Sequence, residues 1–160
     1  MTQKVIAIDP GERVGWATAE YVAPSPELGA DREGLFLVNH GISLLKPFAL
    51  KLAEVIPNYD IIIYEKFVLY AGEKGRSQVG SEIPTAQLVG MIRLLAWLND
   101  KKLISQGATV KKTADKTAQG VFKELIESES KTHDDAHDID AIRHVWYWYW
   151  KQEVSDGQQA

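Results

Sequence analysis

The chain has 160 residues, of which 45% are hydrophobic and 25% charged, and its net charge is −4. This length suits one domain with a sizeable core, so we expect a single domain over residues 1–152 and a flexible tail over residues 153–160. The absence of cysteine excludes a disulfide scaffold, a thiolate zinc site and a cysteine nucleophile. With no apolar run long enough for a membrane helix and no signal-peptide pattern, we expect a cytoplasmic protein.

The first half of the chain is typical of strands separated by turns. Its opening apolar run ends at Asp9-Pro10-Gly11, a turn signal. Residues 59–64 (YDIIIY) are apolar on both faces, which is typical of a strand in the middle of a sheet. We expect strands at Lys4–Ile8, Gly15–Tyr21, Leu35–Leu45 and Tyr59–Tyr64, and a short helix at Pro47–Ile56.

The second half is predicted to be mainly helical. Residues 68–80 are rich in glycine and charge, which indicates a loop. Apolar residues then recur at helical spacing in two segments. We expect helices at Pro84–Asn99 and Ala114–Ser128, with a short strand at Gly107–Val110 between them. A capping-box pattern at residues 132–135 predicts a last helix from about His133 to Lys151.

This order of elements predicts an α/β fold. A three-stranded antiparallel meander is followed by parallel strands reached through helical crossovers. The expected result is a mixed five-stranded sheet flanked by helices.

Three acidic residues occupy positions where chemistry could gather. Asp9 and Glu65 each end a strand, and Asp140 lies in the last helix. Neighbouring strands lie about 4.7–4.9 Å apart, so acids at the ends of parallel neighbours can meet, and a helix crossing that edge can add a third. Such carboxylates suit Mg²⁺ or Mn²⁺. Each also has a structural reading: a turn residue, an exposed strand end and a solvated helix face, respectively.

The last helix carries two histidines beside Asp140. At 100° per residue, His137 lies about 60° and His144 about 40° from Asp140, whereas Asp138 points about 160° away. We therefore expect the two histidines to share a face with Asp140 and Asp138 to lie outside that site. His137 can also be a satisfied polar residue of the helix packing.

Charge is distributed unevenly along the chain. Residues 127–140 carry a net charge of −5, and residues 101–116 carry +4. This pattern fits a protein that holds a polyanion near bound cations, and it also fits a solvated surface with uneven charge. Charge alone does not decide between these readings.

Three short motifs occur in order within residues 4–150: VIAIDPGERVGWATAE, IIIYEKF and AHDIDAIRH. The first resembles the opening strand-turn-strand of RuvC-type Holliday junction resolvases, the second their second acidic strand, and the third their C-terminal helix. The ending Asp-Ala-hydrophobic-Arg-His is similar to the phage-encoded branch of this family. For a phage protein, the expected location is the host cytoplasm.

This resemblance implies an RNase H-like fold, a homodimer and Mg²⁺-dependent paired nicking at four-way DNA junctions. It implies a metal site formed by Asp9, Glu65, His137 and Asp140. We expect two Mg²⁺ ions, for which Mn²⁺ should substitute, with Asp9 bridging both. Hydrolysis of this kind would leave 5′-phosphate and 3′-hydroxyl ends.

The resemblance also implies a DNA-contacting surface, because residues 107–116 (GATVKKTADK) are similar to the family's basic DNA-contacting segment. Bacterial members carry an aromatic residue three positions after the second acid, where this chain has Val68; Phe67 or Tyr70 could replace it. Selection would rest on branch shape and not on base-edge reading, and the sequence leaves open whether forks and flaps are substrates as well as four-way junctions. The candidate DNA contacts are Lys66, Phe67, Lys74, Arg76, Lys111, Lys112 and Lys116.

The helix containing QLVGMIRLL resembles the dimer-side helix of the family. Its apolar residues over Leu88–Leu98 can form a subunit interface or pack against the sheet of their own subunit. Both arrangements fit the sequence.

Three other functions compete with junction resolution. A pre-ribosomal-RNA processing nuclease shares the opening motif but lacks an acid equivalent to Glu65, which argues against it. A non-catalytic, dimeric DNA-structure binder would bind junctions without cutting them. An actin-like ATPase has a phosphate loop resembling DPGERVGWA but needs two lobes, which 160 residues cannot hold.

Overall fold

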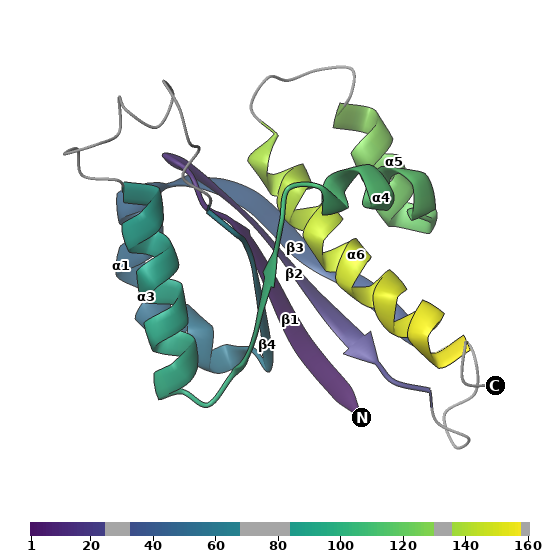
Figure 1. Ribbon diagram of the computed structural model, residues 1–160, viewed down its shortest axis with the longest axis horizontal. Helices are drawn as coiled ribbons and strands as arrows, with labels where there is room; N and C mark the ends of the chain where they lie inside the picture. The colour runs from purple at the N-terminus through teal and green to yellow at the C-terminus, as the bar shows by residue number, and fades with distance from the viewer. Residues whose placement is uncertain (25–32, 68–83, 130–135, 158–160) are drawn as a thin grey trace.

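The computed structural model describes residues 1–24, 33–67, 84–129 and 136–157 (Figure 1). The predicted loop over residues 68–80, with Lys74 and Arg76, and the capping box at residues 132–135 lie outside this part of the chain. None of the described helices combines the length and apolarity needed to cross a bilayer. The elements are β1 (Thr2–Asp9), β2 (Arg13–Val22), β3 (Gly34–Leu44), α1 (Leu45–Val55), the 3-10 helix η2 (Ile56–Asn58), β4 (Ile61–Glu65), α3 (Pro84–Leu98), β5 (Lys102–Gln106), α4 (Val110–Thr117), α5 (Gly120–Glu129) and α6 (His137–Gly157).

The five strands form one mixed sheet in the order β3-β2-β1-β4-β5. Strands β1, β2 and β3 pair antiparallel, whereas β1 pairs in parallel with β4, and β4 with β5. This confirms the predicted α/β fold, a meander followed by parallel strands. The central positions of β1 and β4 explain why both are buried on both faces.

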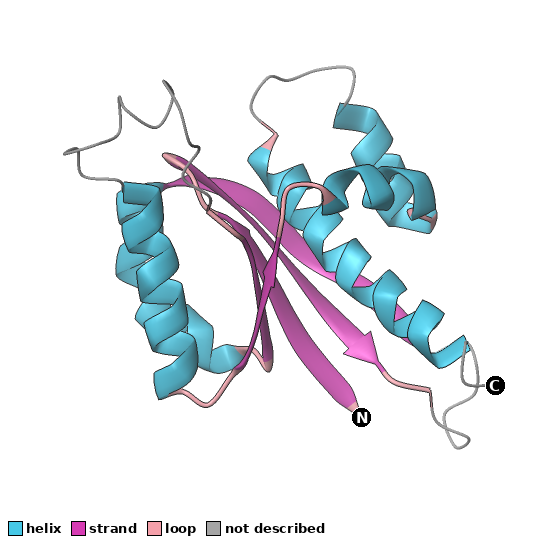
Figure 2. Cartoon of the chain, viewed as in Figure 1, coloured by secondary structure: helices cyan, strands magenta, loops and turns pink. Residues whose placement is uncertain are grey.

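Helices cover the two faces of the sheet, with α1 and α3 on one side and α4, α5 and α6 on the other (Figure 2). Side chains alternate between the faces along each strand. In β1, Val5 and Ala7 pack with α6, whereas Ile6 and Ile8 pack with α1 and α3. Asp9 continues the first set, and Glu65 does the same in β4. The strand period therefore directs both acids toward α6.

The last strand lies earlier than predicted. The expected strand at Gly107–Val110 is wrong, because β5 spans Lys102–Gln106 and Val110 already begins α4. Pairing explains the difference, since residues 102–106 run beside β4 from Ile61 to Glu65. The alternative assignment would place the strand beyond the end of β4.

The predicted helix over Ala114–Ser128 is divided into α4 and α5. Ala118 follows α4 with extended backbone angles, and Gly120 begins α5 with φ at +54°, a left-handed value that glycine adopts readily. The periodicity of the apolar residues continues through this break, so the sequence pattern conceals it. The last helix also differs, because α6 continues to Gly157 instead of ending near Lys151.

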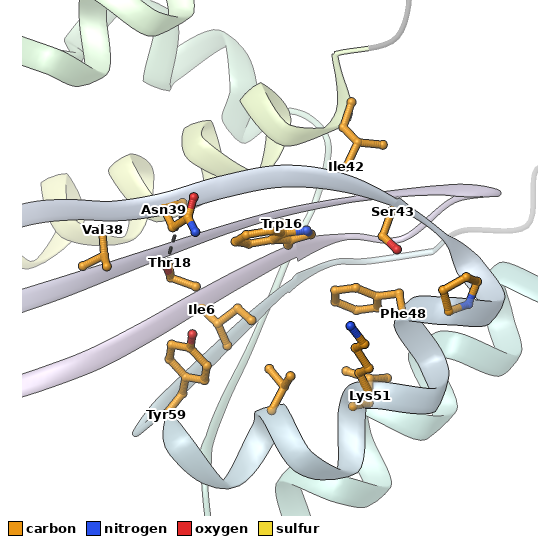
Figure 3. A pocket seen from close by; sticks show the side chains of 13 residues that line it. Ile6, Trp16, Thr18, Val38, Asn39, Ile42, Ser43, Phe48, Lys51 and Tyr59 are labelled. Atoms are coloured by element: carbon orange, nitrogen blue, oxygen red, sulfur yellow. Dashed lines mark hydrogen bonds between the residues drawn. The ribbon is translucent and has the colours of Figure 1, made fainter.

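A cavity of about 560 Å³ lies between α1 and strands β1–β3 (Figure 3). The indole of Trp16 lines this cavity and lies next to Gly41, where an added Cβ atom would be 3.0 Å from the ring. Phe48 and Tyr59 line the cavity together with Ile6, which belongs to the core beneath α1 and α3. The cavity is therefore on the sheet face opposite α6, away from the face to which Asp9 and Glu65 turn.

Candidate active site

Parallel pairing brings Asp9 and Glu65 to the same edge of the sheet. The register of β1 with β4 pairs Ile8 with Tyr64, so the next residue of each strand is the acid. Asp9 is buried, with 6% of its surface exposed, and Glu65 is half-buried. Helix α6 crosses this edge and adds His137, Asp140 and His144.

Asp9 is joined to the first residue of α6. Its Oδ2 atom lies 2.7 Å from Nδ1 of His137. Burial raises the pKa of Asp9 above its usual value, although His137 and the charge of Lys111 act in the opposite direction. The charges of Glu65 and Asp140 raise it further, which shows that the three carboxylates lie within electrostatic reach of one another.

The close approach of α6 to the sheet depends on Gly15. A Cβ atom at this position of β2 would lie 2.6 Å from the backbone nitrogen of Asp138 and closer still to the carbonyl group of His137. Real Cβ contacts are essentially never shorter than 3.0 Å. Glycine therefore lets the start of α6 rest directly on the strand that pairs with β1, within reach of Asp9.

The ammonium group of Lys111, on α4, lies between the other two acids. Its Nζ atom is 2.7 Å from Oε2 of Glu65 and 2.6 Å from Oδ2 of Asp140. Burial opposes ionisation of both Lys111 and Glu65, but hydrogen bonding outweighs it. The pKa of Lys111 is raised, and that of Glu65 is lowered to about 2 by the hydrogen bonds from His144 and Lys111. The site therefore holds ionised carboxylates around a cation.

Asp140 is held on both oxygens. Lys111 binds Oδ2, and Nη1 of Arg143 donates to Oδ1 at 2.9 Å. The same guanidinium donates from Nε to Asp115 of α4 at 2.7 Å. Arg143 thus ties the face of α6 that carries Asp140 to α4. Nothing in the sequence pairs Arg143 with Asp115, because the contact depends on how two distant helices meet.

His144 is fully buried beneath Glu65. Its Nε2 atom lies 3.0 Å from Oε2 of Glu65, and its Nδ1 atom lies 2.6 Å from the side chain of Gln106, at the end of β5. The helical spacing correctly placed His144 on the face of Asp140. Gln106 was missed, because the last strand was predicted at Gly107–Val110 and Gln106 instead ends β5.

Asp138 lies outside this group, as its helical angle predicted. Its carboxylate binds Nδ1 of His40, on β3, at 2.8 Å. This pair and the bond between Asp9 and His137 attach the start of α6 to two different strands. His40 was missed because nothing in the sequence links β3 to the last helix.

The donor set around Lys111 fits a divalent cation. Within the described ranges, no three acidic or histidine side chains are already grouped as a metal site. The positive charge among these acids is instead the ammonium group of Lys111: two carboxylates bind it directly, and Asp9 interacts with its charge. Carboxylate oxygens and one imidazole are suitable ligands for Mg²⁺ or Mn²⁺.

The candidate DNA contacts are distributed around this edge. Lys66 is exposed and Phe67 half-buried, directly after Glu65. Lys112 and Lys116 are exposed on α4, whereas Lys111 points into the carboxylate cluster. The described candidates therefore lie on the two segments, the end of β4 and α4, that also carry Glu65 and Lys111.

Neither a family model nor a curated protein sequence matches the chain. Solved structures do resemble it. RuvC of Thermus thermophilus has a TM-score of 0.61 at 12% identity, covering 94% of this chain and 96% of the other. The fowlpox virus resolvase, solved with Holliday junction DNA, has a TM-score of 0.52 at 15% identity, with coverages of 95% and 97%. For the yeast mitochondrial Holliday junction resolvase the values are 0.55, 14%, 97% and 83%.

These comparisons confirm the expected fold. The chain has the mixed sheet and flanking helices of RuvC-type, RNase H-like proteins over almost its full length. The similarity to the phage-encoded branch stays a prediction.

Proposed function

We propose that this protein is a metal-dependent endonuclease that resolves Holliday junctions and related branched DNA by paired nicks. The observation that carries the proposal is that Glu65 and Asp140 both bind the ammonium group of Lys111, with the buried carboxylate of Asp9 close enough to interact with their charges. Phosphodiester hydrolysis with Mg²⁺ requires a cluster of carboxylates that binds the ions. The fold supports junction DNA as the substrate, because its structural neighbours are junction resolvases.

Asp9, Glu65, His137 and Asp140 would hold two Mg²⁺ ions, with Mn²⁺ as a substitute. Bound Mg²⁺ would lower the pKa of a water nucleophile and stabilise charge on the leaving 3′ oxygen, giving a 5′ phosphate and a 3′ hydroxyl. Asp9 orients His137 through Nδ1, which leaves Nε2 for a ligand or for the attacking water. Arg143 fixes Asp140 against α4.

Lys111 would have two roles in this scheme. Without metal, its ammonium balances Glu65 and Asp140. If Glu65 and Asp140 held a divalent ion, the Lys111 ammonium would no longer be needed to balance them, and its charge would be available for a phosphate of the DNA. The exposed Lys66, Lys112 and Lys116 would add phosphate contacts around the site, so binding should weaken steeply as salt increases.

A homodimer would provide two active sites for two symmetric cuts. Helix α3 has two apolar faces. On one of them, Leu88, Ile92 and Ala96 pack against the sheet of their own subunit. The opposite face leaves a row of apolar side chains exposed, including Trp97 at 77%. We propose this row as the dimer interface: Met91, Leu94, Trp97 and Leu98.

Cleavage of a four-way junction, a fork and a linear duplex of matched sequence tests the proposal. We expect Mg²⁺-dependent, paired cuts in the junction and no cuts with chelator. Asp9→Asn and Asp140→Asn should abolish cleavage while the junction is still bound. Asp138→Asn is the matched control and should retain cleavage, because its amide oxygen can still accept a bond from His40.

Three outcomes would contradict parts of the proposal. Normal turnover by Asp9→Asn would reject the metal site. Equal cutting of linear DNA would remove junction selectivity but keep the nuclease. Binding without cleavage at any Mg²⁺ concentration would favour a non-catalytic binder of branched DNA.

A further inference from the structure

A buried histidine, His144, contacts the candidate site without belonging to its proposed ligand set. Its side chain has no exposed surface, and its neighbours on α6 include the apolar core residues Ile142 and Val145. An unpaired polar group in such a place is costly, and an aliphatic side chain would avoid that cost. The position of His144 therefore calls for an explanation in terms of what its two ring nitrogens hold.

Both ring nitrogens of His144 have partners. An ionised carboxylate can only accept hydrogen bonds, so Nε2–H donates to Oε2 of Glu65 at 3.0 Å. The Oε1 atom of Gln106 lies 2.6 Å from Nδ1. Because a half-turn of the amide would bring its NH₂ group to the same place, Gln106 can pair with Nδ1 as a donor or as an acceptor. The ring is thus fixed between β5 and the end of β4.

Two donors meet on one oxygen of Glu65. His144 reaches Oε2 from the buried side, and Lys111 reaches the same atom at 2.7 Å. Among the described residues, no hydrogen bond is formed with the other oxygen, Oε1. The carboxylate is therefore held in one rotational position, with Oε2 tied to the protein interior and Oε1 without a donor from the described part of the chain.

We propose that His144, braced by Gln106, is a positioning residue that orients Glu65 for metal binding. This inference rests on the proposed metal site and adds a supporting layer to it. If Lys111 left Glu65 on metal binding, the hydrogen bond from His144 to Oε2 would still hold the carboxylate in its present orientation. Hydrogen-bonded partners behind metal ligands typically contribute 10- to 100-fold to metal affinity.

The test measures Mn²⁺ binding to the full chain without DNA, by electron paramagnetic resonance of free Mn²⁺, alongside the melting temperature in chelator. His144→Leu removes the donor at similar volume, and His144→Gln keeps an N–H donor. Gln106→Leu removes the brace without touching Glu65. Val145→Ala is the matched control, since it disturbs the same buried helix away from the carboxylates.

We expect His144→Leu to weaken Mn²⁺ binding about 10- to 100-fold, Gln106→Leu to weaken it less, and His144→Gln to recover part of the loss. Val145→Ala should lower the melting temperature and leave Mn²⁺ affinity unchanged. In a Glu65→Gln background, His144→Leu should cause no further loss. If His144→Leu does not fold, Gln106→Leu and His144→Gln decide the question, because unchanged Mn²⁺ affinity in both would overturn the positioning role.

The failures of the two proposals are distinguishable. If Glu65→Gln weakens Mn²⁺ binding but the His144 variants bind as tightly as the unmodified protein, the positioning role is overturned and the metal site stands. If the unmodified protein does not bind Mn²⁺, or Glu65→Gln binds it equally well, the metal site falls and the positioning role falls with it.

Discussion

Replacing Gly15 with alanine should shift the start of α6 relative to Asp9, while every side chain of the candidate site stays chemically unchanged. The added methyl carbon would lie 2.6 Å from the nitrogen of Asp138 and closer to the carbonyl of His137. These are backbone atoms, so a change of side-chain rotamer cannot relieve the clash. The start of α6 would have to withdraw by on the order of 1 Å, and a misplacement of that size can cost about a hundredfold in rate.

The assay compares single-turnover junction cleavage at saturating Mg²⁺ with junction affinity in chelator. We expect cleavage to fall about a hundredfold and affinity to change much less, because the nearest atoms to the added methyl group belong to His137 and Asp138 and not to the exposed lysines of α4. Gly90→Ala is the control, since a Cβ there meets nothing within 4 Å; its dimerisation would be checked in parallel. Cleavage by Gly15→Ala at the unmodified rate would refute the claim that this contact sets the position of α6.

Three further substitutions test the charges and the surface. Burial raises the pKa of Asp9, so its ionised form costs stability at pH values above its unfolded pKa; Asp9→Asn should raise the melting temperature in chelator at pH 7. Lys111→Met should lower that temperature by leaving Glu65 and Asp140 unbalanced, and millimolar Mg²⁺ should restore it, which thermal scans with and without Mg²⁺ would check. If the proposed dimer forms through α3, Trp97→Glu should convert it to monomers in size-exclusion chromatography, and the monomer should stay folded, because this side chain is 77% exposed in the single chain.

The acidic edge could be predicted because it follows from short-range rules. Two apolar strands that end in acids, and a helix whose period places His137, His144 and Asp140 on one face, require only local geometry. Parallel pairing of β1 with β4 then makes the acids meet. The exclusion of Asp138 follows from the same helical period, and its bond to His40 agrees with it.

The supporting contacts could not be predicted, because each joins elements that the chain connects only through folding. Gln106 meets His144, Asp115 meets Arg143, and His40 meets Asp138 across separations of 28 to 98 residues. Lys111 was predicted to contact DNA, and its place between two acids depends on how α4 docks on α6. The break between α4 and α5 was missed because Gly120 interrupts the backbone but not the apolar period.

Helix α6 carries both residues of the candidate site and much of the aromatic core. Along α6, His137, Asp140 and His144 face the acidic edge, and Trp146 and Trp148 then pack into the core with Phe122 and Tyr21. Because the helix is continuous to Gly157, a tilt at either end is transmitted to the other. A change in the indole fluorescence of these tryptophans would therefore report a shift of α6 at the acidic edge.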